Sequence, residues 1–264
     1  MKEIQIVVCM KQVPDPEAPP DAFKIDSITK KVIPIGVPPL LNPYDENALE
    51  AALRIKEHHS AKITVISVGE KVANAIMKKT IAAGADDLII VQDPSFADLN
   101  SRSTAIVLLT AIKRLGRYDL ILTGRQAGDW DFGVTGLLLA EMLEIPSISF
   151  ARRIEIENEK ILVEKLTLNG FELVESPMPV LVTVSSEIGE LRYVSVRALQ
   201  KVSNERIKVY NAIDLGIDIS KLEKREILQL LSINLGRHCK FIEGESPQEK
   251  ATNLAILMRK EGIL

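Results

Sequence analysis

The chain has 264 residues, of which 46% are hydrophobic and 26% charged, as in an ordinary globular protein with one large domain or two small ones. Its formal net charge is −3 and its lysines and arginines are spread along the chain, which argues against a nucleic-acid binder and against attraction to an anionic membrane. Two cysteines make no disulfide framework, and the first apolar run is too short for a signal sequence or a membrane span, so we expect a cytoplasmic protein.

The N-terminal part predicts a strand, a long loop and a helix. The continuous apolar run at 4–10 indicates a strand covered on both faces. Eight prolines between residues 14 and 43 predict an extended loop, in which residues 24–38 are suited to a small hairpin. Asn42 stands in the N-cap position and Pro43 in the first helical position, which predicts a helix at 43–58.

The alternation of strand and helix patterns continues to about residue 150. The predicted elements are a strand at 63–68, a helix at 70–83, a strand at 88–91, a helix at 101–115 and a strand at 120–123. This order predicts an α/β fold with a doubly wound, mostly parallel sheet.

The pattern changes after residue 150. Residues 154–168 read as two alternating strands joined at Asn158, and residues 179–186 as another strand, so we expect an antiparallel extension of the sheet. Beyond about residue 200 the sequence lacks a core pattern until a well-capped helix that begins at Ser246 and Pro247. We therefore predict a nucleotide-binding domain at 1–200 and a C-terminal arm at 201–264 that packs on a partner subunit.

A glycine-rich loop between the strand at 120–123 and the next apolar stretch is the main candidate site. Its glycines, Gly124, Gly128, Gly133 and Gly136, match neither the dinucleotide fingerprint nor the phosphate-loop spacing. Glycines nevertheless allow close approach of a phosphate, a helix start supplies free N–H groups, and Arg125 and Thr135 add a cation and a hydroxyl. The alternative is a tight strand-to-helix turn without a ligand.

The other polar residues of this loop favour binding over catalysis. Asp129 and Asp131 would repel a phosphate, so we expect them to cap N–H groups or to accept from ribose hydroxyls, and we expect Trp130 to serve in packing. The sequence contains neither a GxSxG elbow nor an HExxH motif, and no Ser-His-Asp arrangement or metal cluster is apparent. We expect no catalytic residue and no metal ligand.

Several motifs occur in the same order in a known family, and the chain resembles the beta subunit of electron transfer flavoproteins almost from end to end. The motifs are KQVPDP at 11–16, NPYDENALEAALRIKE at 42–57, GADDLIIV at 84–91, GRQAGDWDFGVTG at 124–136 and GELRYVSVRALQK at 189–201. The resemblance implies a Rossmann-like fold of the adenine nucleotide hydrolase type. It also implies a heterodimer with an alpha subunit that holds FAD, while the beta subunit binds AMP or, in electron-bifurcating members, a second FAD.

The resemblance further implies particular site residues, and electron exchange with an acyl-CoA-type dehydrogenase. The nucleotide-binding residues implied are Cys9, Asn42, Pro43, Tyr44, Asp45, Val68, Gly124, Arg125, Gln126, Ala127, Gly128, Asp129, Asp131, Gly133, Val134 and Thr135. The partner-docking residues implied are Arg192, Tyr193, Val196 and Lys201. Val196 replaces a leucine anchor that is common in the family, which leaves open which dehydrogenase docks. Val134 and Phe132 depart from the usual loop, which leaves open the identity of the bound nucleotide.

Three other functions remain open from the sequence. The first is a bifurcating complex in which this chain holds a flavin that accepts hydride from NADH. The second is an adenine-nucleotide enzyme of similar fold, although KQVPDP stands where such an enzyme needs a Ser-Gly-Gly-rich loop. The third is a stand-alone nucleotide-binding regulator, which the weakly patterned tail disfavours.

Overall fold

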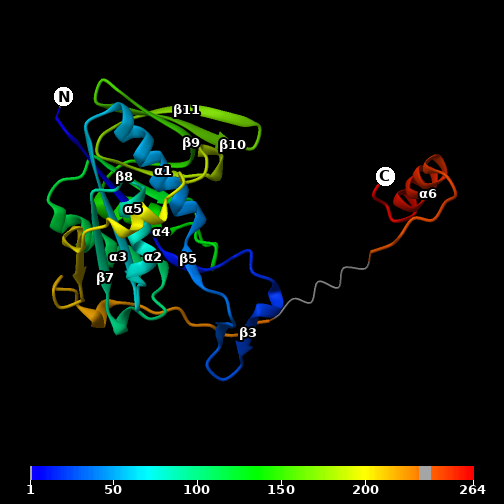
Figure 1. Cartoon of the computed structure of the whole chain (residues 1–264), viewed down its shortest axis with the longest axis horizontal. Coiled ribbons are helices and arrows are strands. Elements are labelled where there is room, and N and C mark those ends of the chain that lie inside the picture. The colour runs from blue at the N-terminus through cyan, green and yellow to red at the C-terminus, as the bar shows by residue number, and fades with distance from the viewer. Residues whose placement is uncertain (1, 232–238) are drawn as a thin grey trace. The chain divides into compact units, whose positions relative to one another are not determined.

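The computed structural model describes residues 2–231 and 239–264 (Figure 1). The described residues divide into two units, the first ending at Leu228 and the second beginning at Gln229. The first unit thus extends past the predicted boundary at residue 200. It does so because a strand at Ile207–Tyr210 pairs with the edge of the central sheet.

The central sheet of the first unit has nine strands in the order β11-β10-β9-β12-β8-β1-β6-β7-β13. The strands are β1 (Ile4–Cys9), β6 (Ala61–Gly69), β7 (Asp87–Gln92), β8 (Leu120–Gly124), β9 (Ser147–Glu157), β10 (Lys160–Thr167), β11 (Gly170–Pro177), β12 (Val180–Val184) and β13 (Ile207–Tyr210). Within the part of the sheet ordered β9-β12-β8-β1-β6-β7-β13, each strand runs parallel to its neighbours. The strand β10 pairs antiparallel with β9 on one side and with β11 on the other. The predicted α/β class with a mostly parallel sheet is confirmed.

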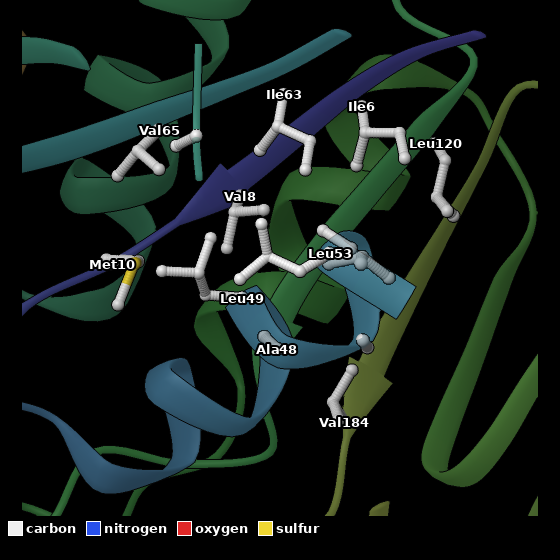
Figure 2. Packing of buried hydrophobic residues seen from close by; sticks show 14 of the residues in the cluster. Ile6, Val8, Met10, Ala48, Leu49, Leu53, Ile63, Val65, Leu120 and Val184 are labelled. Carbon is white, nitrogen blue, oxygen red and sulfur yellow. The ribbon is translucent and has the colours of Figure 1, made fainter. Parts of the chain in front are cut away.

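Helices cover both faces of this sheet. The helices α1 (Pro43–His58) and α2 (Asn74–Ala83) contribute to the core on one face. The helices α3 (Ser101–Leu115) and α4 (Thr135–Leu143) contribute to the core on the other. Figure 2 shows Leu49 and Leu53 of α1 packed against Val8 of β1, with all three side chains nearly inaccessible to water. Burial of such apolar surface is the main source of stability for this layered fold.

The smaller elements lie outside the central sheet. They are the β2–β5 ladder (Gln12–Pro14 with Pro39–Leu41), the β3–β4 hairpin (Phe23–Asp26 with Lys31–Pro34), the helices α5 (Val196–Gln200) and α6 (Pro247–Lys260), and the 3₁₀ turns η1 (Pro20–Ala22), η2 (Pro94–Phe96), η3 (Ser186–Ile188), η4 (Asn204–Arg206) and η5 (Ile219–Lys221). The hairpin predicted within residues 24–38 is therefore present.

Two local predictions need correction. The strand at 180–184 does not extend the sheet antiparallel, because β12 inserts between β9 and β8 and runs parallel to both. The second helix begins at Asn74 and not at residue 70, since the preceding N–H of Ala73 donates to Oε1 of Gln12 and that of Val72 to Oε1 of Gln92. These two bonds hold residues 70–73 in an irregular turn at the end of β6.

The second unit contains one described helix. The Ser246 side chain accepts from the N–H of Glu249, which confirms the predicted N-cap of α6. None of the residues of α6 is buried. Among the described residues, no helix combines the length and apolar character that a membrane crossing requires.

Candidate functional site

A cavity of about 390 Å³ opens where the parallel strands β1, β6 and β8 end. Cys9, Val68 and Gly124 contribute to its wall from these three strand ends. The carboxyl edge of a parallel sheet is where doubly wound proteins bind their ligands, and the volume lies in the range of small-molecule pockets. The cavity is therefore the candidate site.

A buried carboxylate ties two of these strand ends together. Asp45, in the first turn of α1, accepts from the N–H of Lys11 at 2.8 Å and from the N–H of Gly124 at 3.0 Å. Only glycine fits at position 124, because a Cβ there would lie 2.6 Å from both Oδ1 of Asp45 and the backbone carbon of Tyr44. The start of the glycine-rich loop is thus fixed against α1.

Asn42 also fixes the glycine-rich loop, although it does not form part of the cavity wall. Its fully buried side chain donates from Nδ2 to the carbonyl oxygen of Gln126 at 2.8 Å and accepts at Oδ1 from the N–H of Gly128 at 3.1 Å. It makes no side-chain cap to α1, although it occupies the N-cap position. The predicted N-cap position is confirmed, but the Asn42 side chain does not cap the helix, because its amide nitrogen and oxygen bond to backbone groups of the loop.

Burial raises the pKa of Asp45 to about 7, although hydrogen bonds from Asn42, Lys11 and Gly124 oppose the rise. The ordinary pKa of an aspartate is about 3.9, so the folded protein holds more protons than the unfolded chain between about pH 4 and pH 7. We expect the free energy of unfolding to fall as pH rises through this window, by about 1–4 kcal/mol. Urea unfolding at pH 5, 6, 7 and 8 measures the decline.

The Asp45→Asn variant is the control for this decline, because it removes the titrating group. Its free energy of unfolding is expected to change much less than that of the wild type between pH 5 and pH 8, whatever its absolute stability. Equal slopes for the two proteins would show that Asp45 does not titrate in this range.

Charged side chains of the loop have partners that the sequence did not indicate. Asp129 forms an ion pair with Nζ of Lys11 at 2.5 Å, and Asp131 accepts from Nε2 of Gln126 at 2.8 Å. Within the described part of the chain, neither carboxylate is bonded to a backbone N–H, so the expected capping role is not observed. The guanidinium of Arg125 lies 4.8 Å from the centre of the Tyr44 ring, and its buried Nε has no hydrogen-bond partner in the described part of the chain.

The structure brings ten of the predicted nucleotide residues into the cavity wall. They are Cys9, Asp45, Val68, Gly124, Arg125, Gln126, Ala127, Asp129, Gly133 and Thr135. The other six, Asn42, Pro43, Tyr44, Gly128, Asp131 and Val134, are not part of the wall. Of these, Asn42 and Gly128 help to set the loop conformation, and Tyr44 supports Arg125.

Part of the wall was not predicted from the sequence. The unpredicted residues include the segments 69–72 and 96–99, residues 10–12, and Arg225, together with the loop aromatics Trp130 and Phe132. The signal for the first two was available, since both follow parallel strands and therefore lie at the same edge of the sheet. Trp130 packs against Phe132 at a centroid distance of 6.0 Å, as expected of a packing residue, and it also forms part of the cavity wall.

The predicted docking segment lies beside α1. Arg192 donates to both carboxylate oxygens of the buried Glu50 and to Glu57, which fixes the backbone at this point. The adjacent Tyr193 is 89% exposed and Val196 is 67% exposed. Lys201 is also exposed. The segment thus combines a fixed base with side chains that are open to contact.

No group of three or more His, Cys, Asp and Glu side chains suited to a metal ion occurs in residues 2–231 and 239–264. The described residues of the cavity wall include two arginines, two lysines and aromatic faces, together with four acidic side chains, of which Asp45, Asp98 and Asp129 already have partners. This arrangement suits an anionic ligand with a planar ring.

Comparison with known proteins gives a consistent result. A family model described as "Electron transfer flavoprotein domain" matches residues 31–215. The chain is 38% identical over 220 residues to the electron transfer flavoprotein subunit beta of Thermoanaerobacterium thermosaccharolyticum, covering 83% of each chain. It is 35% identical to the subunit beta of Clostridium acetobutylicum, again covering 83% of each chain. It is also 35% identical to the caffeyl-CoA reductase-Etf complex subunit CarD of Acetobacterium woodii, covering 81% of this chain and 80% of that one.

Proposed function

The chain belongs to the electron transfer flavoprotein family as a beta subunit, and from this premise we propose that its cavity binds an adenine nucleotide while an alpha subunit carries the FAD. In this function the chain performs no bond chemistry. It holds a nucleotide, pairs with the alpha subunit and presents a docking surface to an electron donor or acceptor.

The observation that carries the proposal is the glycine-rich loop fixed at the carboxyl edge of the sheet. The bonds from Asp45 and Asn42 set the loop, and Gly124 and Gly133 expose backbone to the cavity. Thr135 opens α4 beside the same cavity, so the positive end of that helix dipole is available to a phosphate. Arg125 adds a fixed cation.

The docking partner that we propose is an acyl-CoA-type dehydrogenase, which exchanges electrons with the FAD of the heterodimer. Tyr193 and Val196 project from the segment that Arg192 and Glu50 fix. Exposed aromatic and aliphatic side chains on a rigid base are typical of interface anchors. Valine in place of leucine at the anchor removes one methylene, which is worth roughly 1–3 kcal/mol in a fitted pocket, so the partner's pocket is expected to be shallower.

A second candidate function places FAD in the cavity of this chain, where it would accept hydride from NADH and split the electrons. The specific observation in its favour is the pair of aromatic faces, Trp130 and Phe132, on the cavity wall. Two such rings suit the large isoalloxazine ring of a flavin as well as an adenine.

An anaerobic reduction experiment separates the two functions. The co-expressed heterodimer is mixed either with NADH alone or with an acyl-CoA substrate and its dehydrogenase, and flavin absorbance is followed near 450 nm. The carrier function predicts bleaching only in the second mixture. Bleaching of a second flavin by NADH alone would favour the bifurcating function, and no bleaching in either mixture would contradict both.

A further inference from the structure

A segment near the end of the first unit reaches the nucleotide cavity through backbone pairing. Residues Leu99 and Lys224 form an antiparallel bridge, and the N–H of Arg225 donates to the carbonyl oxygen of Asp98 at 2.8 Å. The N–H of Glu223 donates to Oγ of Ser103 at 2.7 Å. These bonds join the segment to the loop between β7 and α3 and to the first turn of α3, and they bring the side chain of Arg225 into the cavity wall.

The Arg225 guanidinium has unused hydrogen-bonding capacity. Its carbon lies 4.0 Å from the centre of the Trp130 ring, and among residues 2–231 and 239–264 its buried Nε has no hydrogen-bond partner. Asp98 forms a long ion pair with the guanidinium, with Oδ1 3.9 Å from a guanidinium nitrogen and so beyond hydrogen-bond distance, and the Asp129 carboxylate is engaged by Lys11 at 2.5 Å. Buried polar groups in proteins are normally paired, so a partly buried guanidinium with a free donor indicates a missing partner.

Arg125 repeats this arrangement in the wall of the same cavity. It too is placed over an aromatic ring, that of Tyr44, and has a buried Nε to which no described residue is hydrogen-bonded. Guanidinium groups held against aromatic faces are preorganised to bind phosphate oxygens through paired N–H groups. Two such groups in one cavity fit an anionic ligand better than a neutral one.

We propose that Arg225 binds a phosphate group of the nucleotide in this cavity, so that the segment Leu222–Arg225 completes a site built mainly from the sheet edge. The inference rests on the proposed nucleotide-binding function and adds to it a residue from outside the glycine-rich loop. The anchoring of the segment does not need the side chain, because Glu223, Lys224 and Arg225 hold it through backbone groups.

The test compares Arg225→Gln with Lys224→Gln in the co-expressed heterodimer, stripped of its exchangeable nucleotide. Lys224 is the matched control because it lies in the same segment and its side chain is exposed outside the cavity wall. Calorimetry measures binding of ADP, AMP and adenosine. We expect Arg225→Gln to weaken the binding of ADP and AMP about 10- to 100-fold while changing the affinity for adenosine less than about threefold. We expect Lys224→Gln to leave all three affinities unchanged.

The outcomes separate the inference from the function on which it rests. If Arg225→Gln weakens the binding of adenosine and ADP equally, the residue only supports the local structure. If it leaves ADP and AMP binding unchanged, Arg225 does not contact the phosphate. Either result overturns the inference but not the proposed nucleotide site. If the wild-type heterodimer binds none of the three compounds, the proposed nucleotide site fails together with the inference. Partial recovery of ADP binding in Arg225→Lys, with adenosine unaffected, would further support a charge contact to phosphate.

Discussion

The Gly124→Ala variant is expected to lose its bound nucleotide and about 2–4 kcal/mol of unfolding free energy. The added Cβ would lie 2.6 Å from Oδ1 of Asp45 and from the backbone carbon of Tyr44, which no real Cβ approaches so closely. Because Tyr44 contributes backbone in the first turn of α1, a change of rotamer cannot relieve the clash. Either the end of β8 or the start of α1 must move, and the bond from Gly124 to Asp45 is then strained or broken.

The matched control is Gly128→Ala in the same loop. A Cβ there would lie 3.3 Å from the side chain of Pro16 and 3.9 Å, an ordinary contact distance, from Oδ1 of Asn42, so this change is expected to cost less than about 1 kcal/mol. Chemical unfolding and the nucleotide content of the purified heterodimers measure both effects. A Gly124→Ala protein as stable and as loaded as Gly128→Ala would show that the close approach to α1 does not determine the loop.

Removal of residues 229–264 is expected to weaken association with the alpha subunit more than 100-fold while the first unit stays folded. The second unit leaves large apolar side chains open to water, including Phe241, Leu254, Ile256 and Ile263. An amphipathic helix with no buried residue does not obtain its stability from its own unit and is typical of a segment that packs on a partner. We therefore expect the partner-binding part of the arm predicted at 201–264 to lie beyond Leu228.

Co-purification from co-expressing cells measures this association, and circular dichroism of the shortened chain reports on the first unit. The double variant Leu254→Ser and Ile256→Ser is expected to reproduce most of the loss, whereas Lys250→Ser on the same helix is not. A shortened chain that still co-purifies with the alpha subunit at the wild-type ratio would place the subunit interface elsewhere.

Local sequence signals were sufficient to predict the helices that begin at a recognisable capping residue or proline. The helices at 43–58 and 101–115 have the predicted bounds, because proline or asparagine at the start and an apolar periodicity act within a few residues of each other. The N-cap of α6 was predicted for the same reason. The alternation of strands and helices then sufficed for the fold class.

Long-range pairing explains what the sequence did not predict. The strand β11 has mostly exposed side chains and so lacks an alternating pattern, and the insertion of β12 between β9 and β8 joins strands that are distant in sequence. The true role of Asn42 depends on a loop more than eighty residues away. Arg225 enters the cavity wall only through pairing with residues near 98, which no local pattern encodes.

The proposed function requires the cavity at the carboxyl edge of the sheet to hold an adenine nucleotide. The measurement is denaturation of the purified heterodimer, followed by chromatographic identification and counting of the released nucleotides. We predict two nucleotides per heterodimer, either one FAD and one AMP or two FAD, and loss of one of them in Gly124→Ala. A single FAD with no second nucleotide, or a second nucleotide that Gly124→Ala retains in full, would contradict the account.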